Sequence, residues 1–296
     1  MRTAALALGA WLTATAAWAQ ESPPDDPEPE APPAAAPTAS GQSGSGAPVR
    51  RTFTRSRQFT AADDRAERTR ARLAARQRRR PGEPEVLELP GMPDAYFYRA
   101  AQGGRRRVFV YMHARNADPA ESCRQFSAVV PRFGWLLCPV GPGMGRDGQR
   151  QWNNNPILAR QYATTAVRAL FQRFPRRTRV TDNVLMGFSE GAFVAIQTGL
   201  NEPVMFPRWV IFAAHDRYLA TEGDALAGAR RSLRKLYLIT GRNDEIVAHS
   251  RRAAEQLRRD RLGRVELRVL DGVGHQLPPA FVPTVRTALQ WVTRAP

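Results

Sequence analysis

A serine stands between two glycines in Gly187-Phe188-Ser189-Glu190-Gly191, which matches the pattern G-x-S-x-G. A strand-like apolar run precedes this motif and a helix-like run follows it, so the serine falls on a tight strand-to-helix turn. Both glycines are needed there, because side chains would collide with the neighbouring strand and helix. We expect Ser189 at the carboxyl edge of a sheet, beside a helix N-terminus that favours an anionic intermediate. The motif predicts a nucleophile, and the alternative is an ordinary glycine-rich turn.

A nucleophilic serine needs a base, and the base needs an acid that orients it. His275 follows the last predicted strand, in a glycine-containing turn that can bring the ring back over the sheet edge. Asp244 follows the preceding predicted strand, just before a helix. The resulting chain order of serine, aspartate and histidine is the order that this motif requires. We therefore predict a triad, with Asp216, after the sixth predicted strand, as the alternative acid.

Eight short apolar runs from residue 83 onward predict the strands that must position these side chains. Segments with apolar residues at three-to-four spacing separate them from the third run onward, and the first two runs favour a leading hairpin. Apolar strands alternating with amphipathic helices indicate a mainly parallel sheet with helices on both faces. The predicted strands are Val86–Leu89, Tyr96–Tyr98, Val108–Met112, Trp135–Pro139, Val184–Met186, Trp209–Phe212, Leu236–Thr240 and Val265–Leu270, and the predicted helices are Pro119–Val130, Ile157–Phe174, Glu190–Leu200, Val247–Leu262 and Pro279–Val292.

From about residue 105 to the C-terminus, the sequence resembles the α/β-hydrolase superfamily. The resemblance rests on Gly187–Gly191, on the Gly241-x-x-Asp244-x-x-Val247 turn and on Gly274-His275. It implies an α/β three-layer sandwich with a mostly parallel eight-stranded sheet. The layout is similar to that of dienelactone hydrolases, phospholipase/carboxylesterases and polyester-depolymerase-like esterases. Dienelactone hydrolases carry a cysteine in place of Ser189, which counts against that chemistry.

The oxyanion hole of such enzymes uses two backbone N–H groups. One is expected from Glu190, the residue after the nucleophile. The other is expected from the turn after the third predicted strand, where the family commonly has His-Gly and this sequence has His113-Ala114-Arg115. A backbone donor needs no particular side chain, so Ala114 and Arg115 are both candidates. His113 itself is interpreted as a structural residue of the turn.

Little or no lid is expected, because the segment Ala213–Lys235, where a lid would sit, is short. The loop Gly141–Pro156 is expected to line the site instead. Trp152 of this loop and Phe188, beside Ser189, are the expected substrate-binding aromatic residues. An exposed loop without a role in binding is the alternative for Trp152. The same loop contains Gly143-x-Gly145-x-x-Gly148, but no helix opens after it, so it is not interpreted as a nucleotide site.

The remaining histidines give no sign of a metal in the sequence. His215 and His249 are interpreted as surface or loop residues, and Asp271 as a turn former. No cluster of cysteine, histidine and aspartate has metal-ligand spacing along the chain. We therefore predict neither a metal nor a cofactor.

Two cysteines, Cys123 and Cys138, fall near the start of one predicted helix and the end of the next predicted strand. An even pair in an exported protein favours a disulfide. The short loop that it closes would contribute roughly 3 kcal/mol in the chain-entropy description. Two buried thiols are the alternative.

The segments before the predicted domain differ sharply from it in composition. Residues 1–19 are interpreted as a signal peptide with Ala17-Trp18-Ala19 at the cleavage site, and a retained anchor is the alternative. Residues 20–49 are rich in proline, alanine and acid, which predicts a disordered linker. Residues 50–82 form an arginine-rich arm, expected to include a solvated helix, and residues 83–296 the α/β-hydrolase domain. We expect a secreted or periplasmic protein.

The formal net charge of +17 is carried almost wholly by arginine, since Lys235 is the only lysine among 44 basic residues. Arg50–Arg80 holds twelve arginines against three acidic residues. Such an arm attracts anionic surfaces, but it lacks interleaved aromatic residues or a nucleic-acid module, so no specific nucleic acid is expected. The sequence predicts a serine hydrolase that cleaves small or polymeric carboxylic esters, or thioesters, through an acyl-enzyme. The alternative is an inactive binding protein attached by its arm to an anionic surface.

Overall fold

The computed structural model describes residues 82–145, 148–217, 219 and 222–294. These residues belong to one unit, Ala61–Pro296. The predictions of a signal peptide, a linker and an arginine-rich arm fall on residues outside this described part, apart from position 82, and they stay predictions.

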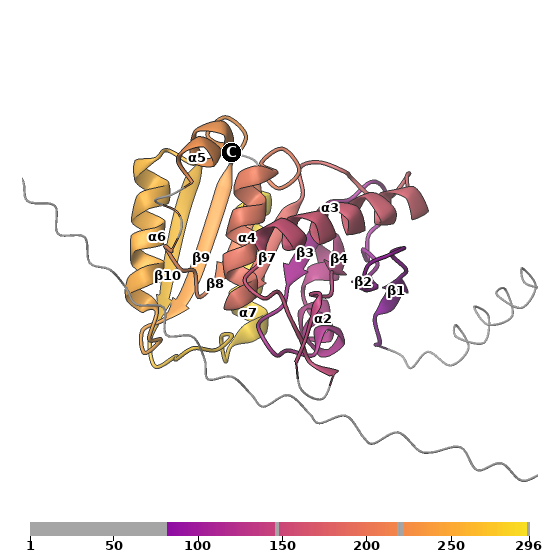
Figure 1. Ribbon diagram of the computed structural model, residues 1–296, viewed down its shortest axis with the longest axis horizontal. Coiled ribbons are helices and arrows are strands. Elements are labelled where there is room, and N and C mark those ends of the chain that lie inside the picture. Colours follow the sequence, from indigo (N-terminus) through magenta and orange to yellow (C-terminus); the bar gives the residue numbers. More distant parts are fainter. Residues whose placement is uncertain (1–81, 146–147, 218, 220–221, 295–296) are drawn as a thin grey trace, which may run out of the picture. The chain divides into compact units, whose positions relative to one another are not determined.

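Eight strands form one sheet in the order β1-β2-β4-β3-β7-β8-β9-β10 (Figure 1). The first two strands form an antiparallel hairpin, and β2 also pairs antiparallel with β4. All other pairs in the sheet are parallel. The sequence predicted all eight strands and the leading hairpin, and the structure confirms them. The strands are β1 (Glu85–Leu87), β2 (Ala95–Tyr98), β3 (Val108–Met112), β4 (Trp135–Cys138), β7 (Val184–Phe188), β8 (Arg208–Phe212), β9 (Lys235–Gly241) and β10 (Arg264–Leu270).

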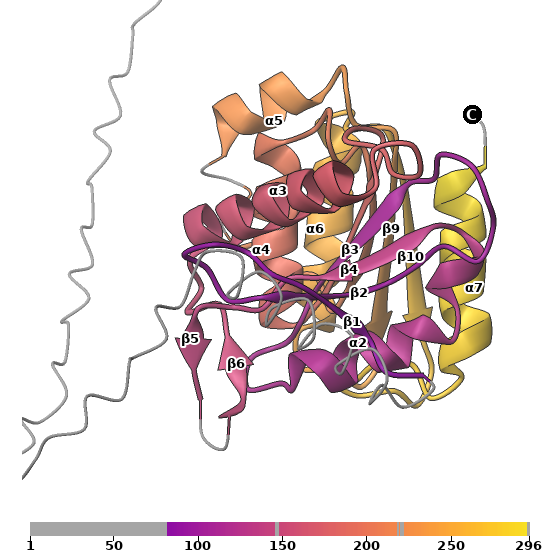
Figure 2. The same ribbon diagram turned by 90° about the vertical axis from the view of Figure 1, so that its right-hand side faces the viewer.

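Helices cover both faces of the sheet, as Figures 1 and 2 show. On one face lie α3 (Pro156–Arg173), α4 (Glu190–Asn201) and α6 (Val247–Arg259), and on the other lie α2 (Pro119–Ser127) and α7 (Phe281–Thr293). Strand β3 is buried along its whole length. Its alternate side chains pack into the two opposite cores, which explains why the strand is apolar throughout. The predicted α/β three-layer sandwich is confirmed.

Local signals fix where two of the helices begin. Asp118 caps α2, because its side chain accepts the N–H groups of Ala120 and Glu121. Asn155 caps α3 by accepting the N–H of Leu158, and a proline follows both caps. These are the preferred residues for a helix start, because they satisfy N–H groups that have no partner within the helix.

The predicted disulfide is present and joins Cys123 of α2 to Cys138 at the end of β4. The two Cα atoms are 5.9 Å apart, within the usual range for a disulfide. Both cysteines are buried in the core between the sheet and the helices α2 and α7. The bridge therefore ties a covering helix to the sheet.

Short elements that the sequence did not predict also lie between the eight strands and the longer helices. The loop Gly141–Pro156 contains a small antiparallel hairpin, β5 (Gly143–Met144) with β6 (Arg150–Gln151). The segment Ala213–Lys235 contains α5 (Gly223–Ala229), and a 3₁₀ turn, η1 (Val130–Arg132), follows α2. Elements of two to seven residues are too short to show a hydrophobic period.

The helix α5 does not form a lid. Its residues Leu226 and Ala229 are buried in the core on the side of α4, at the end of the sheet where β9 begins (Figure 1). Within the described residues, no helix combines the length and the apolar character needed to cross a membrane.

Candidate active site

Ser189 lies on the turn between β7 and α4, with a φ of 56° and a ψ of −121°. A positive φ at a residue with a side chain stores strain, and such strain gathers at functional turns. A Cβ added to Gly187 would collide with the carbonyl oxygen of Gly191, and one added to Gly191 would collide with that of Met112. The close approach of β7, α4 and β3 therefore requires both glycines of the motif. The sequence prediction of a strained strand-to-helix turn is confirmed.

The three predicted triad residues meet at the carboxyl edge of the sheet. His275 Nε2 lies 2.9 Å from Ser189 Oγ. The other ring nitrogen, Nδ1, lies 3.0 and 3.1 Å from the two carboxylate oxygens of Asp244. Ser189 follows β7, Asp244 follows β9 and His275 follows β10, and these parallel strands of one sheet end at the same edge. The arrangement can move a proton from the serine hydroxyl to the imidazole.

The Asp244 carboxylate is held in place from two sides. Its side chain is 1% exposed, and it accepts the backbone N–H of Ile246 at 3.0 Å as well as meeting the imidazole of His275. A Cβ at Gly241 would collide with the carbonyl oxygen of Val273, so the loop that carries the histidine packs directly against the end of β9. A fixed, buried carboxylate of this kind sets the orientation of the imidazole.

The alternative acid, Asp216, lies elsewhere. It follows β8, and its carboxylate oxygens lie 2.6 Å from His249 Nδ1 and 2.6 Å from Arg252 Nε. Among the described residues, the Asp216 carboxylate hydrogen-bonds to His249 and Arg252 and not to His275. Of the two candidate acids, Asp244 is the one that lies beside His275.

Backbone donors for an oxyanion lie next to Ser189. Glu190 is the first residue of α4, and an N–H at that position has no acceptor within its helix. The end of β3 presses against Gly191, where a Cβ would meet the carbonyl oxygens of Met112 and His113. The turn that follows β3 therefore runs beside Ser189. Of its two candidate donors, Arg115 lines the cavity that contains Ser189, and Ala114 is not among the residues lining it.

His113 is a structural residue of this turn, as the sequence predicted. It is buried, and it hydrogen-bonds through Nδ1 to the carbonyl oxygen of Ala114 at 2.8 Å. Its Nε2 accepts the backbone N–H of Gly141 at 2.9 Å, so the proton resides on Nδ1. Burial lowers the pKa of His113 to about 4. The neutral ring joins the turn after β3 to the loop after β4.

The Glu190 side chain has a role that sequence reasoning missed. Its buried carboxylate accepts the backbone N–H of Trp152 at 3.0 Å and that of Asn154 at 2.9 Å. It also pairs with Arg115 Nη2 at 3.2 Å. One side chain of the G-x-S-x-G motif thus anchors both loops that border Ser189. An acidic residue in a first helical turn is common, so the motif alone does not reveal this partner.

The prediction that Trp152 binds substrate is wrong. Its side chain is 0% exposed, and its indole N–H donates to the carbonyl oxygen of His113 at 3.0 Å. The ring packs near those of His113 and Tyr162. A tryptophan in a polar loop can be buried when its N–H finds an acceptor, and here the bonds to Glu190 pull the loop inward. From the same loop, Asn154 lines the cavity.

Phe188 contacts the predicted base and not the cavity. Its ring centroid lies 5.2 Å from that of His275, and the residue is half-buried and is not among those that line the cavity. Phe188 therefore supports the imidazole from the side. It does not line the cavity in which it was predicted to bind substrate.

A cavity of ≈ 340 Å³ lies over Ser189 and His275. Apolar atoms from Phe193 and Ile246 share its wall with the charged residues Arg115, Arg217 and Glu245. None of its described lining residues comes from α5, which agrees with the expectation of little or no lid. The cavity has the size of a site for a small molecule.

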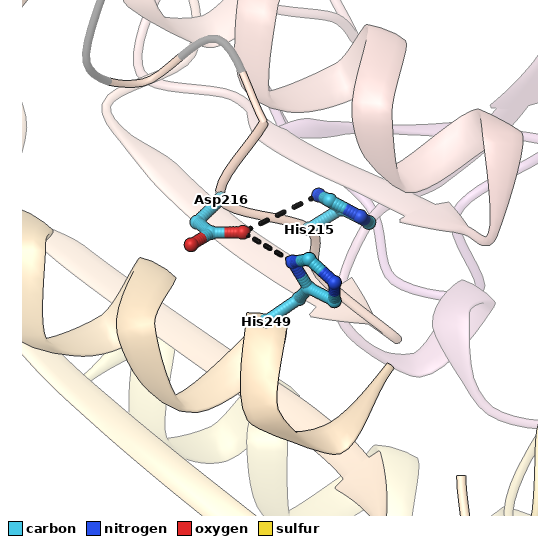
Figure 3. A group of neighbouring side chains, drawn as sticks. All are labelled: His215, Asp216 and His249. Atoms are coloured by element: carbon cyan, nitrogen blue, oxygen red, sulfur yellow. Dashed lines mark hydrogen bonds and ion pairs between the residues drawn. The ribbon is translucent and has the colours of Figure 1, made fainter. Parts of the chain in front are cut away.

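His215 also lines this cavity, and it belongs to a second group of polar side chains (Figure 3). The rings of His215 and His249 stack with their centroids 3.7 Å apart, and the carboxylate of Asp216 lies beside them. Burial and the neighbouring His249 lower the pKa of His215. Burial opposes ionisation of Asp216, but hydrogen bonds from Arg252 and His249 hold the pKa of this carboxyl below its usual range.

The interpretation of His215 as a surface or loop residue is confirmed in that it lies in the loop after β8, whereas His249 lies on the helix α6. Both are half-buried, and one potential ligand atom from each of His215, Asp216 and His249 lies within 4.8 Å of the others. No local pattern in the sequence indicates this group, because Asp216 and His249 are 33 positions apart along the chain. Asp271, by contrast, pairs with Arg242 on an exposed turn, close to the expected role.

No family model and no curated protein matches the sequence. Solved structures do match. An uncharacterised protein from Bacillus cereus ATCC 10987 is 16% identical with a TM-score of 0.57, over 76% of this chain and 67% of that one. Esterase PE8 is 18% identical with a TM-score of 0.51, over 68% and 98%. Acyl-protein thioesterase 2 from Zea mays is 17% identical with a TM-score of 0.50, over 67% and 97%. At these identities the comparisons show a shared fold, that of the α/β-hydrolases.

Proposed function

We propose that this protein with the α/β-hydrolase fold is a serine hydrolase that cleaves carboxylic esters or thioesters through an acyl-enzyme. One observation carries the proposal. A continuous line of contacts runs from Ser189 Oγ through both nitrogens of His275 to the buried carboxylate of Asp244. The serine occupies a strained turn at a helix N-terminus, where an anion is favoured.

In the acylation step, His275 Nε2 takes the proton of Ser189 Oγ while the oxygen attacks the carbonyl carbon. The carbonyl oxygen becomes an oxyanion and accepts the N–H of Glu190 and a second N–H from the turn after β3. His275 then gives its proton to the departing alcohol or thiol, and an acyl-serine remains. Asp244 stays ionised and accepts the Nδ1–H throughout.

Water completes the cycle by the same route. His275 removes a proton from the water, which attacks the acyl carbon through a second oxyanion. The serine oxygen then leaves and recovers the proton from Nε2. The steps balance without a cofactor, and the residues already in place supply each proton transfer.

The cavity volume favours substrates with a small acyl group. Its ≈ 340 Å³ volume is at the lower end for small-molecule sites. Esterase PE8 and acyl-protein thioesterase 2 share the fold, and both ester and thioester carbonyls suit the mechanism above. We include both bond types in the proposal, with small-molecule and polymeric esters as substrates.

We also propose that the protein is exported and that its arginine-rich arm associates with anionic surfaces. The support is the signal-like pattern of residues 1–19 and the arginine content of Arg50–Arg80. Deletion of residues 50–82 should weaken retention on a polyanion column and flatten its salt dependence. Unchanged retention would remove the role of the arm.

The proposed function is tested by turnover of short-chain p-nitrophenyl esters and matched thioesters. We expect the parent to hydrolyse at least one of these classes and Ser189→Ala to lose at least about 10³-fold in kcat/KM. Thermal unfolding confirms that the variant is folded. Equal rates in the parent and Ser189→Ala contradict the mechanism, and a folded parent that cleaves neither class favours the binding-protein alternative.

A further inference from the structure

The loop after β8 and the helix α6 bring together three side chains of types that can ligate a metal (Figure 3). His215 and Asp216 come from the loop, and His249 comes from the first turns of the helix. Each offers a ligand atom within 4.8 Å of the other two, and all three side chains are half-buried. None of the three acts in the proposed hydrolysis.

The contacts within this group do not fit a simple hydrogen-bond network. His249 Nδ1 lies 2.6 Å from Asp216 Oδ1 and 2.7 Å from Arg252 Nη2. A ring nitrogen that donates to the carboxylate carries a proton and cannot accept from the guanidinium. A ring nitrogen that accepts from the guanidinium has no proton and cannot donate to the carboxylate. One of these two short contacts therefore stays unfavourable in either tautomer. A metal cation in place of the guanidinium would attract both the nitrogen lone pair and the carboxylate.

One of the two known ligand distances already matches a small metal ion, and the other requires a small movement. Zinc bonds to histidine nitrogen and carboxylate oxygen are about 2.0–2.2 Å long, so two ligand atoms in a tetrahedral site are about 3.3 Å apart. His215 Nδ1 lies 3.4 Å from Asp216 Oδ1, which already has this spacing. The pair of Asp216 Oδ1 and His249 Nδ1 needs to open by about 0.7 Å to reach it. His215 Nδ1 also accepts the N–H of Arg217 at 2.9 Å, a local bond that the metal would replace.

Arg252 is the competitor for this position. It lies three residues after His249 on α6, and its guanidinium contacts both the carboxylate and the ring. The Arg252 side chain is 53% exposed, so it can turn into solvent at little free-energy cost. Its presence shows that the group already attracts a cation, while its charge opposes a second one nearby.

We propose that His215, Asp216 and His249 bind a divalent transition-metal ion of the zinc type, with water completing the coordination. Two imidazoles and one carboxylate suit zinc and its neighbours, whereas magnesium and calcium take oxygen ligands. Because His215 also lines the cavity over Ser189, the ion stands in the wall of that cavity. The site is independent of the hydrolytic mechanism and binds metal even in a chain without hydrolase activity.

The experiment is a zinc titration of the untagged, chelator-treated full-length chain at pH 7.5, in competition with a chromophoric chelator. The sequence has four histidines and two cysteines, and both cysteines are in the disulfide, so few other ligands compete. We expect one zinc per chain. His249→Gln and Asp216→Asn should each weaken binding at least tenfold, and a thousandfold excess of Mg²⁺ should not displace the zinc.

Two matched arginine variants sharpen the test. Arg252→Met removes the competing guanidinium and should tighten zinc binding several-fold. Arg251→Met removes the exposed neighbouring charge on the same helix and should change the affinity less than twofold. His275→Gln should leave the stoichiometry at one, since the proposed site does not include that ring.

Three results overturn the proposal: no zinc bound by the folded parent, equal affinity in the parent and in both His249→Gln and Asp216→Asn, or zinc lost in His275→Gln instead. Thermal unfolding with and without zinc identifies any variant that fails to fold, and Asp216→Asn then replaces His249→Gln. An Arg252→Met variant that binds no more tightly than Arg251→Met contradicts the competitor role and counts against the site.

Discussion

The protein contains two histidine–aspartate pairs beside one another at the carboxyl edge of the sheet, and they differ in their surroundings. In each pair the carboxylate follows a strand, β9 for Asp244 and β8 for Asp216, and meets Nδ1 of a histidine. In the first pair the other ring nitrogen reaches a serine hydroxyl. In the second pair the neighbours are a second imidazole and a guanidinium. The chemistry of such a pair is set by what stands next to the ring.

Burial separates the two carboxylates as well. The Asp244 side chain is 1% exposed and that of Asp216 is 19% exposed. Asp244 is bound by a backbone N–H and the imidazole, whereas Asp216 divides its charge between Arg252 and His249. A buried carboxylate that serves one imidazole orients it firmly, whereas a carboxylate paired with an exposed arginine can exchange that arginine for another cation.

Exchanging the two histidines for glutamine gives the largest expected contrast. His275→Gln removes the base and should lower kcat on the order of 10⁵-fold or more. His249→Gln, assayed after chelation, should lower it less than tenfold. Steady-state kinetics on one ester substrate measures both. Comparable losses would mean that the second pair takes part in the reaction.

The same contrast should hold for the acids, with a smaller effect. Asp244→Asn keeps the shape but favours the wrong imidazole tautomer, so kcat should fall by about 10⁴-fold. Asp216→Asn should cost less than tenfold. If Asp216→Asn is instead the more damaging change, the alternative acid of the sequence prediction is restored.

A third histidine, His113, extends the comparison to stability. Burial lowers its pKa to about 4, against about 6.5 in an unfolded chain. Below pH 6.5 the unfolded state binds a proton at His113 that the folded state does not bind. The contribution of the neutral His113 to the free energy of unfolding is therefore fully present above pH 6.5. It declines as the pH falls from 6.5 to about 4, by up to about 3 kcal/mol.

Urea unfolding at several pH values checks this sign. The free energy of unfolding of His113→Gln should fall less steeply than that of the parent between pH 6.5 and 4. An identical slope in both proteins would show that His113 is not the group that resists protonation.

The smallest contrast lies between the buried carboxylate of Glu190 and the more exposed one of Asp216. Glu190→Gln places an amide donor against the N–H of Trp152 or Asn154, which should destabilise the fold by about 1–3 kcal/mol. Asp216→Asn breaks half-exposed ion pairs and should cost no more than about 1 kcal/mol. Denaturant midpoints measure both, and a reversed ranking would contradict the anchoring role of Glu190.

The sequence was sufficient to predict the sheet and the meeting of Ser189, Asp244 and His275, because both depend on local patterns. The strands β3, β4 and β7 are apolar throughout, and β10 alternates apolar with charged residues. Ser189, Asp244 and His275 each follow a strand of the parallel part of the sheet, whose carboxyl ends meet at one edge. The glycines of the motif are explained by contacts with adjacent backbone. Topology alone then brings distant residues together.

The remaining site residues depend on tertiary contacts that carry no local pattern. Trp152 is buried because Glu190, 38 residues away, accepts its backbone N–H. His249 faces a helix neighbour, Arg252, and a loop residue, Asp216, so spacing along the chain does not reveal the group. The hairpin of β5 and β6 is held by main-chain bonds over two residues in each strand. Such features follow from packing and not from periodicity.

Covalent labelling with a fluorophosphonate probe tests the central claim most directly. Intact-mass and peptide analysis should show one adduct, on Ser189, in the parent and in His249→Gln, with very slow labelling of His275→Gln and none of Ser189→Ala. An adduct that persists in Ser189→Ala, or a folded parent that never reacts, would contradict the assignment of Ser189, His275 and Asp244 as the working triad.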